Sequence, residues 1–433
     1  MHHINHNIFL QLDYSGRCIM RKNAVYLSML FGALGFLVYG FMLSDISQVL
    51  AGFRKILFSS DILITDYMEI AGVGPAIINA SIVTLCSIGL LYYNRVEAGG
   101  YTVAVVGLMF GFSLFGKNIF NIWFILLGSY LYTKVVRKPF SEYLCIGLLS
   151  TALSPIISFV FFKDGLLMMN VLVAIVLGVS IGFVVPVLAA FTKTIHKGYI
   201  LYNVGFACGL LALVIVPIMK SYGVILSSLS FWSVGNNPLF VPPLYLGCIL
   251  LVLLGLVLDK RVFKRYGELL KSSGKCPCDF IKRYGKAPVL VNMGVNGIIA
   301  TSYILLIGGD FNGPTLGGIF SIMAFSAYGK HPRNMIPVIM GVVLGGVTKQ
   351  FALTDPSIQI AALFSTTLAP LAGAFGPWVG ILSGFIHSSV VLHAGGGYSG
   401  MNLYNNGYAG GIVFLVIFPL VSALRKKPLS QDS

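Results

Sequence analysis

Fourteen long apolar runs constrain this chain more than any other feature of its sequence. A helix of about 20 apolar residues crosses the roughly 30 Å hydrocarbon core of a bilayer, where irregular backbone is not tolerated against lipid. Hydrophobic residues make up 57% of the chain and charged residues only 10%, which excludes an ordinary soluble enzyme and a disordered protein. We therefore predict an all-α integral membrane protein with about 14 spans: Ala24–Leu43, Gly72–Tyr93, Tyr101–Phe115, Ile119–Val136, Tyr143–Phe162, Leu166–Phe191, Ile200–Met219, Phe240–Leu258, Val289–Gly308, Pro314–Tyr328, Asn334–Val347, Ile358–Phe375, Val379–His393 and Tyr408–Leu424.

Two internal alignments predict that the chain is a duplication. Residues 97–128 align with 310–341 at an offset of 213, and residues 182–217 align with 384–419 at an offset of 202. Many of the identical positions are Gly, Lys, Asn or Tyr, which a shared apolar composition does not explain. We assign residues 20–220 to a first membrane repeat and residues 236–427 to a second. The second repeat includes a basic loop at 259–288.

The predicted spans divide equally, seven to each repeat, so the second repeat enters the membrane in the opposite direction. Loop charge supports this orientation, because positive residues are enriched in cytoplasmic loops. With a cytoplasmic N-terminus, only six of the 29 Lys and Arg residues fall outside: Arg54, Lys55, Lys117, Lys163, Lys220 and Lys349. The prediction is two inverted repeats with both termini in the cytoplasm. Membrane topology then explains the net charge of +15 without nucleic-acid binding.

The N-terminal residues and the close cysteine pair are two further features of the sequence, and neither is expected to bind a metal. Residues 1–19 form a polar leader that contains three histidines, and Met20-Arg21-Lys22 resembles a natural start before an apolar run. We interpret the leader as an over-extended start rather than a metal-binding tail. Cys276-Pro277-Cys278 is the one close cysteine pair, but it has no second pair or histidine nearby, so we predict no metal site there.

The third helix of each repeat is the main candidate for a solute site. Both runs have 15 residues, which is too short to span a bilayer, and each follows an acidic residue and a Gly turn. Inverted-repeat transporters bind their substrate near the midplane, where half-helix N-termini offer unpaired N–H groups. We expect Thr102, Thr315 and Asn312 at these helix starts to bind the solute, and Glu97 and Asp310 to couple ions or protons. The alternative is two ordinary interface loops.

Two further groups of residues are candidates. Lys117 and Lys330 end the short helices in matching Gly-Lys turns, and they either contact an anionic substrate or gate its path, or else snorkel at the helix ends. The Gly-rich segment 394–407 contains Asn405 and is expected to line a cavity. His387 either relays protons or is a structural histidine.

The sequence favours a secondary transporter or channel for a small polar or anionic solute, with H⁺ or Na⁺ as possible coupling ions. We find no nucleotide-binding motif, no catalytic Ser-His-Asp spacing and no sign of a cofactor, so we do not expect an enzyme. A membrane enzyme acting on a lipid-linked substrate, with His387 and Asp310 as acid and base, is the alternative. A non-transporting partner or sensor is a third possibility. The expected partners are the lipid bilayer, the solute and, in an oligomer, further copies of the chain.

Two stretches also resemble a known family. These are 310–330 with Asn334 and, most specifically, Leu403-Tyr404-Asn405-Asn406-Gly407-Tyr408-Ala409-Gly410-Gly411. They resemble an uncharacterised bacterial membrane family, domain of unknown function 1576, over most of the chain. That resemblance implies a multi-pass protein of the bacterial inner membrane and no particular activity. Separately, seven-plus-seven inverted repeats with short third and tenth helices are similar in architecture to transporters of the uracil-permease type.

Overall fold

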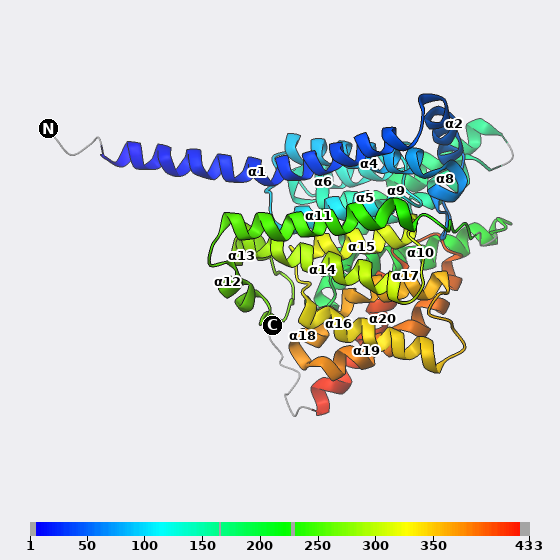
Figure 1. Cartoon of the computed structure of the whole chain (residues 1–433). Coiled ribbons are helices and arrows are strands. Elements are labelled where there is room, and N and C mark those ends of the chain that lie inside the picture. The colour runs from blue at the N-terminus through cyan, green and yellow to red at the C-terminus, as the bar shows by residue number, and fades with distance from the viewer. Residues whose placement is uncertain (1–5, 164–165, 227–229, 425–433) are drawn as a thin grey trace.

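The protein is a bundle of helices. The computed structural model describes the backbone of residues 6–163, 166–226 and 230–424, and side chains within these ranges from Ala24 onward. No strand occurs in these ranges. Most of the long helices run roughly side by side (Figure 1). The helices are α1 (His6–Leu43), α2 (Ile46–Leu57), α3 (Tyr67–Ala71), α4 (Val73–Tyr93), α5 (Gly100–Phe112), α6 (Trp123–Val135), α7 (Leu144–Ser150), α8 (Ser154–Phe161), α9 (Leu167–His196), α10 (Asn203–Ser221), α11 (Asn237–Leu258), α12 (Val262–Leu269), α13 (Phe280–Tyr284), α14 (Lys286–Leu306), α15 (Gly313–Phe325), α16 (Pro332–Thr348), α17 (Pro356–Phe364), α18 (Ala369–Phe375), α19 (Pro377–Ala394) and α20 (Asn405–Leu424).

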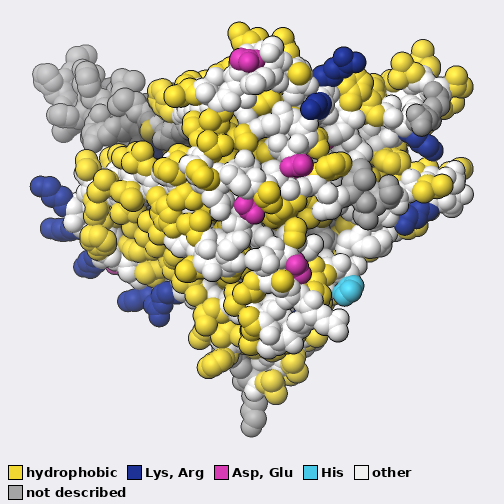
Figure 2. All heavy atoms as spheres, turned by 45° about the vertical axis from the view of Figure 1, so that its right-hand side comes forward, with side chains coloured by type: hydrophobic (Ala, Val, Ile, Leu, Met, Phe, Trp, Pro, Cys, Tyr) yellow, Lys and Arg dark blue, Asp and Glu magenta, His cyan; other side chains and the backbone are white. Residues whose placement is uncertain are grey.

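Many of these helices can cross a membrane. Within the described ranges, ten helical stretches of at least 18 residues are apolar enough to do so, and α5 and α15 are two shorter apolar helices of 13 residues each. Apolar side chains cover much of the surface, and Lys and Arg gather toward the margins of the view (Figure 2). The chain is therefore a multi-pass membrane protein. The four predicted spans beyond these ten are α5, α6, α15 and α16, which have 13, 13, 13 and 17 residues.

The polar leader joins the first span. Helix α1 runs without a break from His6 into the apolar segment, and residues 1–5 and 425–433 lie outside the described residues. In Figure 1 this part of α1 extends beyond the bundle on the side where α12 and α13 lie. The interpretation of the leader as a non-native start stays a prediction.

The two halves of the chain build the same local structure at positions 213 apart. Helices α4 and α14 both have 21 residues, and α5 and α15 both have 13, with starts offset by that interval. The side-chain amide of Asn79 donates to the carbonyls of Ser113 and Lys117, at 2.7 and 2.9 Å. Asn292 donates to the equivalent carbonyls of Ser326 and Lys330, at 2.8 and 2.7 Å.

Helices α5 and α15 pack antiparallel along their whole length. Gly100 at the start of α5 lies against the carbonyl of Ala327, just beyond the end of α15, and Gly313 lies in the same way against the carbonyl of Leu114. Between these ends Gly111 faces Gly317 at backbone distance. Small residues allow such close helix contacts within a membrane. The two helix starts therefore do not meet each other near the midplane, because each start meets the other helix's end.

Two of the predicted spans are interrupted. A short 3₁₀ segment at Thr151–Leu153 separates α7 from α8, and another at Ser365–Leu368 separates α17 from α18. Both breaks contain Ser-Thr, then Leu, then Pro155 or Pro370 in the first turn of the next helix. Proline is tolerated there because its missing N–H would have no helical partner. Backbone groups at these breaks are used across the halves: Leu403 donates to the carbonyl of Ala152 at 2.9 Å, and Leu201 donates to that of Thr367 at 3.1 Å.

The starts of α10 and α20 cross next to these breaks. Gly205 and Gly407 are in backbone contact there, since a Cβ on either would lie about 3 Å from the other's Cα. Each of these helices is preceded by a Tyr, which is Tyr202 for α10 and Tyr404 for α20. The crossing fixes both tyrosines in the middle of the bundle, close to the ends of α15 and α5.

Candidate functional site

Two Lys–Tyr pairs stand at the centre of the protein. The ammonium of Lys117, just beyond α5, donates to the hydroxyl of Tyr404 at 2.7 Å, and the ammonium of Lys330, just beyond α15, donates to the hydroxyl of Tyr202. Each pair joins one half of the chain to the other. Both lysines are fully buried, and each ammonium also lies 4.6 Å from the ring centroid of its tyrosine.

Local backbone geometry explains why the lysines point inward. Gly116 and Gly329, directly before them, have φ of +114° and +107°, a conformation that glycine adopts without strain. The turn is fixed when the N–H of Lys117 bonds the Phe112 carbonyl and that of Lys330 bonds the Phe325 carbonyl, both at 3.0 Å. The side chains therefore leave the ends of α5 and α15 toward the crossing of α10 and α20.

Neither lysine has a carboxylate partner among the described residues. Lys117 contacts only the Tyr404 hydroxyl, the sulfur of Met109 at 3.5 Å and two aromatic rings. Lys330 contacts the Tyr202 hydroxyl and two aromatic rings. An ammonium group has three N–H donors, so among the described residues one donor of Lys117 and two donors of Lys330 have no acceptor. Burying an ammonium group without a charged partner is costly, so each lysine is either neutral in this state or lacks acceptors that an anion would supply.

A cavity of about 410 Å³ reaches these pairs from one end of the bundle. Tyr202 and Tyr404 form part of its wall, together with Phe325 and Tyr328 from the end of α15 and the turn beyond it. Its outer wall carries the polar side chains Glu142, Lys193, His196, Asn203 and Cys276. Tyr202 and Tyr404, the hydrogen-bond partners of the two lysines, line the cavity, whereas Lys117 and Lys330 themselves do not.

A buried carboxylate lies near Lys117, and sequence reasoning missed it. Asp61, in the connection between α2 and α3, accepts hydrogen bonds from five neutral groups and has no cationic partner among the described residues. The donors are Tyr67 at 2.6 Å, Asn121 at 2.9 Å, Asn118 at 3.1 Å, and the hydroxyls of Ser59 and Ser158. Burial raises the pKa of Asp61 to about 6, although these donors oppose the rise.

The threonines predicted to bind solute have structural roles. The Thr102 hydroxyl accepts from the N–H of Gly99 at 2.7 Å and is buried at the start of α5. The Thr315 hydroxyl accepts from the N–H of Asn312 at 2.9 Å, and the side chain of Asn312 caps α15 in return. Both helix starts also receive a carboxylate from the other half: Asp279 accepts from Gly100 at 2.8 Å, and Asp66 accepts from Gly313 at 3.1 Å.

The acids proposed for coupling lie away from the Lys–Tyr pairs. Glu97 forms an exposed ion pair with Lys282 at 2.7 Å, and Asp310 accepts from the exposed N–H of Gly235 at 2.9 Å. His387 is buried and shares a hydrogen bond of 3.0 Å with Asn406. The side-chain NH₂ of Asn405 donates to the carbonyl of Val391 at 2.9 Å, and its oxygen accepts from the Tyr398 hydroxyl.

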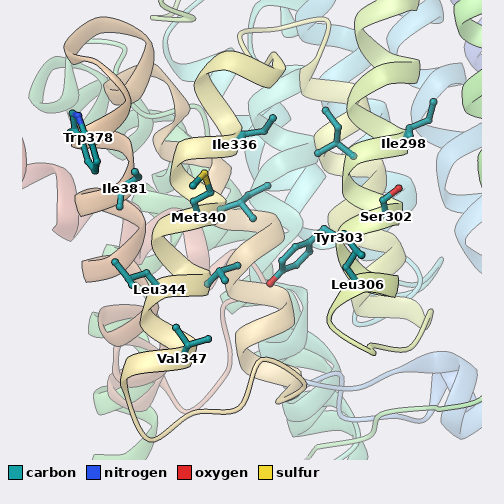
Figure 3. Close-up of a pocket in the computed structure, with 13 residues that line it drawn as sticks. Ile298, Ser302, Tyr303, Leu306, Ile336, Met340, Leu344, Val347, Trp378 and Ile381 are labelled. Carbon is teal, nitrogen blue, oxygen red and sulfur yellow. The ribbon is translucent and has the colours of Figure 1, made fainter.

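Two other features carry no polar site. A groove of about 670 Å³ between α14, α16 and α19 is lined by apolar side chains such as Met340 and Leu344, with Ser302 and Tyr303 as its hydroxyls (Figure 3). It suits an acyl chain rather than a polar solute. The sulfur atoms of Cys276 and Cys278 lie 3.4 Å apart, and within the described ranges no group of three or more His, Cys, Asp or Glu could hold a metal ion.

Comparison with known proteins places the chain in a family. No curated protein and no solved structure matches it. One family model, described as a protein of unknown function (DUF1576), matches residues 23–221 and 258–423, which together make up most of the chain. The match includes both Lys–Tyr pairs and both short helices, and leaves out residues 1–22, 424–433 and 222–257, the last of which contain nearly all of α11. The protein therefore belongs to the DUF1576 family.

Proposed function

We propose that the protein is a membrane transporter for a small anion, which binds at Lys117–Tyr404 and Lys330–Tyr202. The observation that carries the proposal is the pair of fully buried lysines without a carboxylate partner among the described residues, at equivalent positions of the two halves. Ionisable residues inside a membrane protein are costly and commonly mark a substrate or ion pathway. An anion reaching the tyrosines would supply the acceptors that these ammonium groups lack.

The membrane topology is part of the proposal. With α5, α6, α15 and α16 added to the ten longer stretches, the chain has fourteen spans in two inverted sets of seven. The antiparallel contact of α5 with α15 supports inversion, because equivalent helices of the two halves then point in opposite directions. The positive loops at residues 134–138 and 260–286 support a cytoplasmic location for the end of the 410 Å³ cavity that Glu142 and Lys193 line.

The two alternatives have no observation in their favour. A membrane enzyme would need an acid and a base facing one cavity, but Asp310 and His387 share no partner among the described residues. Neither of them lines the cavity at the tyrosines. A sensor that binds without transport would not need two equivalent sites joined across the halves.

A binding measurement tests the proposal directly. The purified protein should be stabilised against thermal unfolding by one or more anions among chloride, phosphate, sulfate, acetate and oxalate, compared at matched ionic strength. A neutral solute such as glycerol should have no comparable effect. At a concentration 100 times the Kd, a ligand that binds only the folded state adds about 2.7 kcal/mol.

Three variants make the test specific. Lys117→Met and Lys330→Met remove the ammonium groups at similar volume, and Lys163→Met, at an exposed position, is the matched control. The anion effect should vanish in the first two and persist in the third. If both buried variants stay folded and keep the wild-type anion response, the lysines do not form the site and the proposal is wrong. Uptake of the stabilising anion into proteoliposomes then separates transport from binding alone.

A further inference from the structure

A second, closed cavity lies on the other side of the same tyrosines. We infer that this closed cavity is the opposite end of the solute route, so that the protein is a carrier with two alternating states rather than an open pore. The inference rests on the proposed function for the solute's chemistry, an anion. The cavity has a volume of only about 20 Å³. Leu108, Tyr202 and Tyr404 line both cavities and form the layer between them.

The wall of the closed cavity has its equivalent within the wall of the larger, open one. Except for Leu108 and Ile360, every residue around the closed cavity has a repeat counterpart around the open one. The pairs, closed side first, are Leu63/Cys276, Phe112/Phe325 and Phe115/Tyr328 at an offset of 213, Phe364/Leu149 at 215, and Leu403/Leu201, Asn406/Val204, Gly407/Gly205 and Tyr404/Tyr202 at 202. The two cavities are therefore one structure built twice, once open and once closed.

The difference between them lies in how tightly the aromatic side chains pack. On the closed side the ring centroids of Phe112 and Phe115 are 4.9 Å apart, whereas the equivalent Phe325 and Tyr328 are 6.4 Å apart. Likewise Phe112 lies 4.4 Å from Tyr404, and Phe325 lies 4.9 Å from Tyr202. The closed cavity has room for about one water molecule, so no solute passes it in this state.

The connections that flank the cavities do not differ in the same way. The N–H of Leu63 bonds the carbonyl of Gly400 at 3.1 Å, and the N–H of the equivalent Cys276 bonds that of Gly198 at 2.9 Å. Both ends therefore keep the same backbone link between the halves. The asymmetry arises in the packing around α5, α15, α10 and α20, where equivalent side chains pack tightly at the closed end and loosely at the open end. Exchange of these arrangements between the halves would open the Leu63 end and close the Cys276 end.

Two residues at equivalent positions can report on this exchange. Cys276 is a native thiol in the wall of the open cavity, and Leu63→Cys places a thiol at its counterpart in the closed one. Both positions are half-buried. Because the sulfur atoms of Cys276 and Cys278 lie 3.4 Å apart, both positions are compared in a Cys278→Ser background. Purified protein, in detergent and in proteoliposomes, would be treated with a small charged thiol reagent, and modification of each position followed by peptide mass spectrometry. In the structure described here, Cys276 should react about tenfold faster, a difference of ~1.4 kcal/mol.

The decisive measurement uses substitutions, without any ligand, to change which of the two ends is open. Phe115→Ala loosens the closed end, and the equivalent Tyr328→Ala loosens the end that is already open. The first change should raise modification at position 63 and lower it at Cys276, whereas the second should leave position 63 slow. Leu403→Ala is a second way to loosen the closed end if Phe115→Ala does not fold.

The outcomes separate this inference from the proposed function. A rise at position 63 with no fall at Cys276 would mean that both ends open together, as in a channel, and would overturn the carrier inference. If the reaction at position 63 stays slow in both Phe115→Ala and Leu403→Ala, the protein has a pocket open at one end only, and this would also overturn the carrier inference. If modification rises at position 63 and falls at Cys276, but no anion stabilises the wild-type protein in the lysine test, the two-state route would stand and the proposed anionic solute would not.

Discussion

The connection before α3 and the connection before α13 occupy equivalent places in the two halves but contain different chemistry. In the first half Asp61 is buried under five neutral donors. In the second half the equivalent position is Gly274, and its backbone lies against the carbonyl of Gly329 and the amide of Asn334. Asn121 and Asn334 hold the adjoining Gly-Lys turns in the same way, at 3.1 and 2.8 Å. The fold of a half therefore does not require the carboxylate.

This difference separates the features that occur in both halves, and so belong to the scaffold, from those that occur at only one end of the proposed solute route. The Lys–Tyr pairs, the capped short helices and the crossing glycines occur twice and define the scaffold. Asp61 occurs once, at the end that is closed, and links the Lys117 turn to α8 through Asn118, Asn121 and Ser158. A titratable group placed at one end only gives the two ends different responses to pH.

The equivalence of the halves can be broken most strongly at two glycines. A Cβ on Gly182 would overlap the carbonyl oxygen of Ile125, and a Cβ on the equivalent Gly384 would overlap that of Val338. Gly182→Ala and Gly384→Ala should each lower the free energy of unfolding by about 3 kcal/mol or more, because backbone cannot yield as a side chain does. Gly89→Ala, where nothing lies within 4 Å, is the control. Equal losses in thermal unfolding would support equivalence, and a loss in only one half would refute it.

Asp61→Asn sharpens the contrast between the two connections. The pKa of Asp61 is about 6 in the folded protein against 3.8 normally, so the folded state holds a proton that the unfolded state releases. Wild-type stability should therefore fall by ~3 kcal/mol as the pH rises from about 4 through 6, and the Asn variant should lose this dependence. Thermal unfolding between pH 4 and 8 measures it. An unchanged pH profile in the variant would show that Asp61 does not titrate in this range.

The two tyrosines should respond unequally to loss of the hydroxyl. The Tyr202 hydroxyl contacts Ser321 as well as Lys330, whereas the Tyr404 hydroxyl contacts Lys117 alone among the described residues. Tyr202→Phe should therefore cost more stability than Tyr404→Phe, with a loss of about 1–3 kcal/mol for each buried group left unpaired. Thermal unfolding of both variants checks this. A larger loss for Tyr404→Phe would contradict the hydrogen-bond pattern.

The smallest effect is expected at the helix starts. Thr102→Val and Thr315→Val remove the hydroxyl of a reciprocal cap and should each cost about 1 kcal/mol of stability. Anion affinity should not change, since each threonine hydroxyl is already bonded within its own helix cap. A tenfold loss of anion affinity with unchanged stability would restore the threonines as solute ligands.

The repeated positions of the candidate site can be found in the sequence. Lys117 and Lys330 stand out because a polar residue recurs at one offset among apolar neighbours, and the Leu-Tyr-Asn motif before α10 and α20 recurs at another. The predicted inversion makes the two short helices antiparallel, but it does not say whether they meet at their starts or lie side by side. The packing of Gly111 on Gly317 shows that they lie side by side.

Other features lacked a repeated signal. Asp61 has no acidic counterpart, and as a single acid between apolar runs it resembles any loop residue. The 3₁₀ breaks do recur, with Pro155 matching Pro370, but at an offset of 215 that lies outside both alignments. The two alignments also gave no indication that Lys117 pairs with Tyr404 rather than with Tyr202, because that choice depends on how the halves face each other.

Exchanging the two halves of the chain leaves the contact between α5 and α15 unchanged. The approach of Gly100 to Ala327 becomes, on exchange of the halves, the approach of Gly313 to Leu114, and the carboxylates of Asp279 and Asp66 exchange in the same way. This is the symmetry of a homodimer interface, in which one surface pairs with a copy of itself. A half-length chain with this surface would assemble with a second copy inserted the other way up. Joining the copies in one chain releases each from the need to match the other, and this freedom allows Asp61 to stand opposite Gly274.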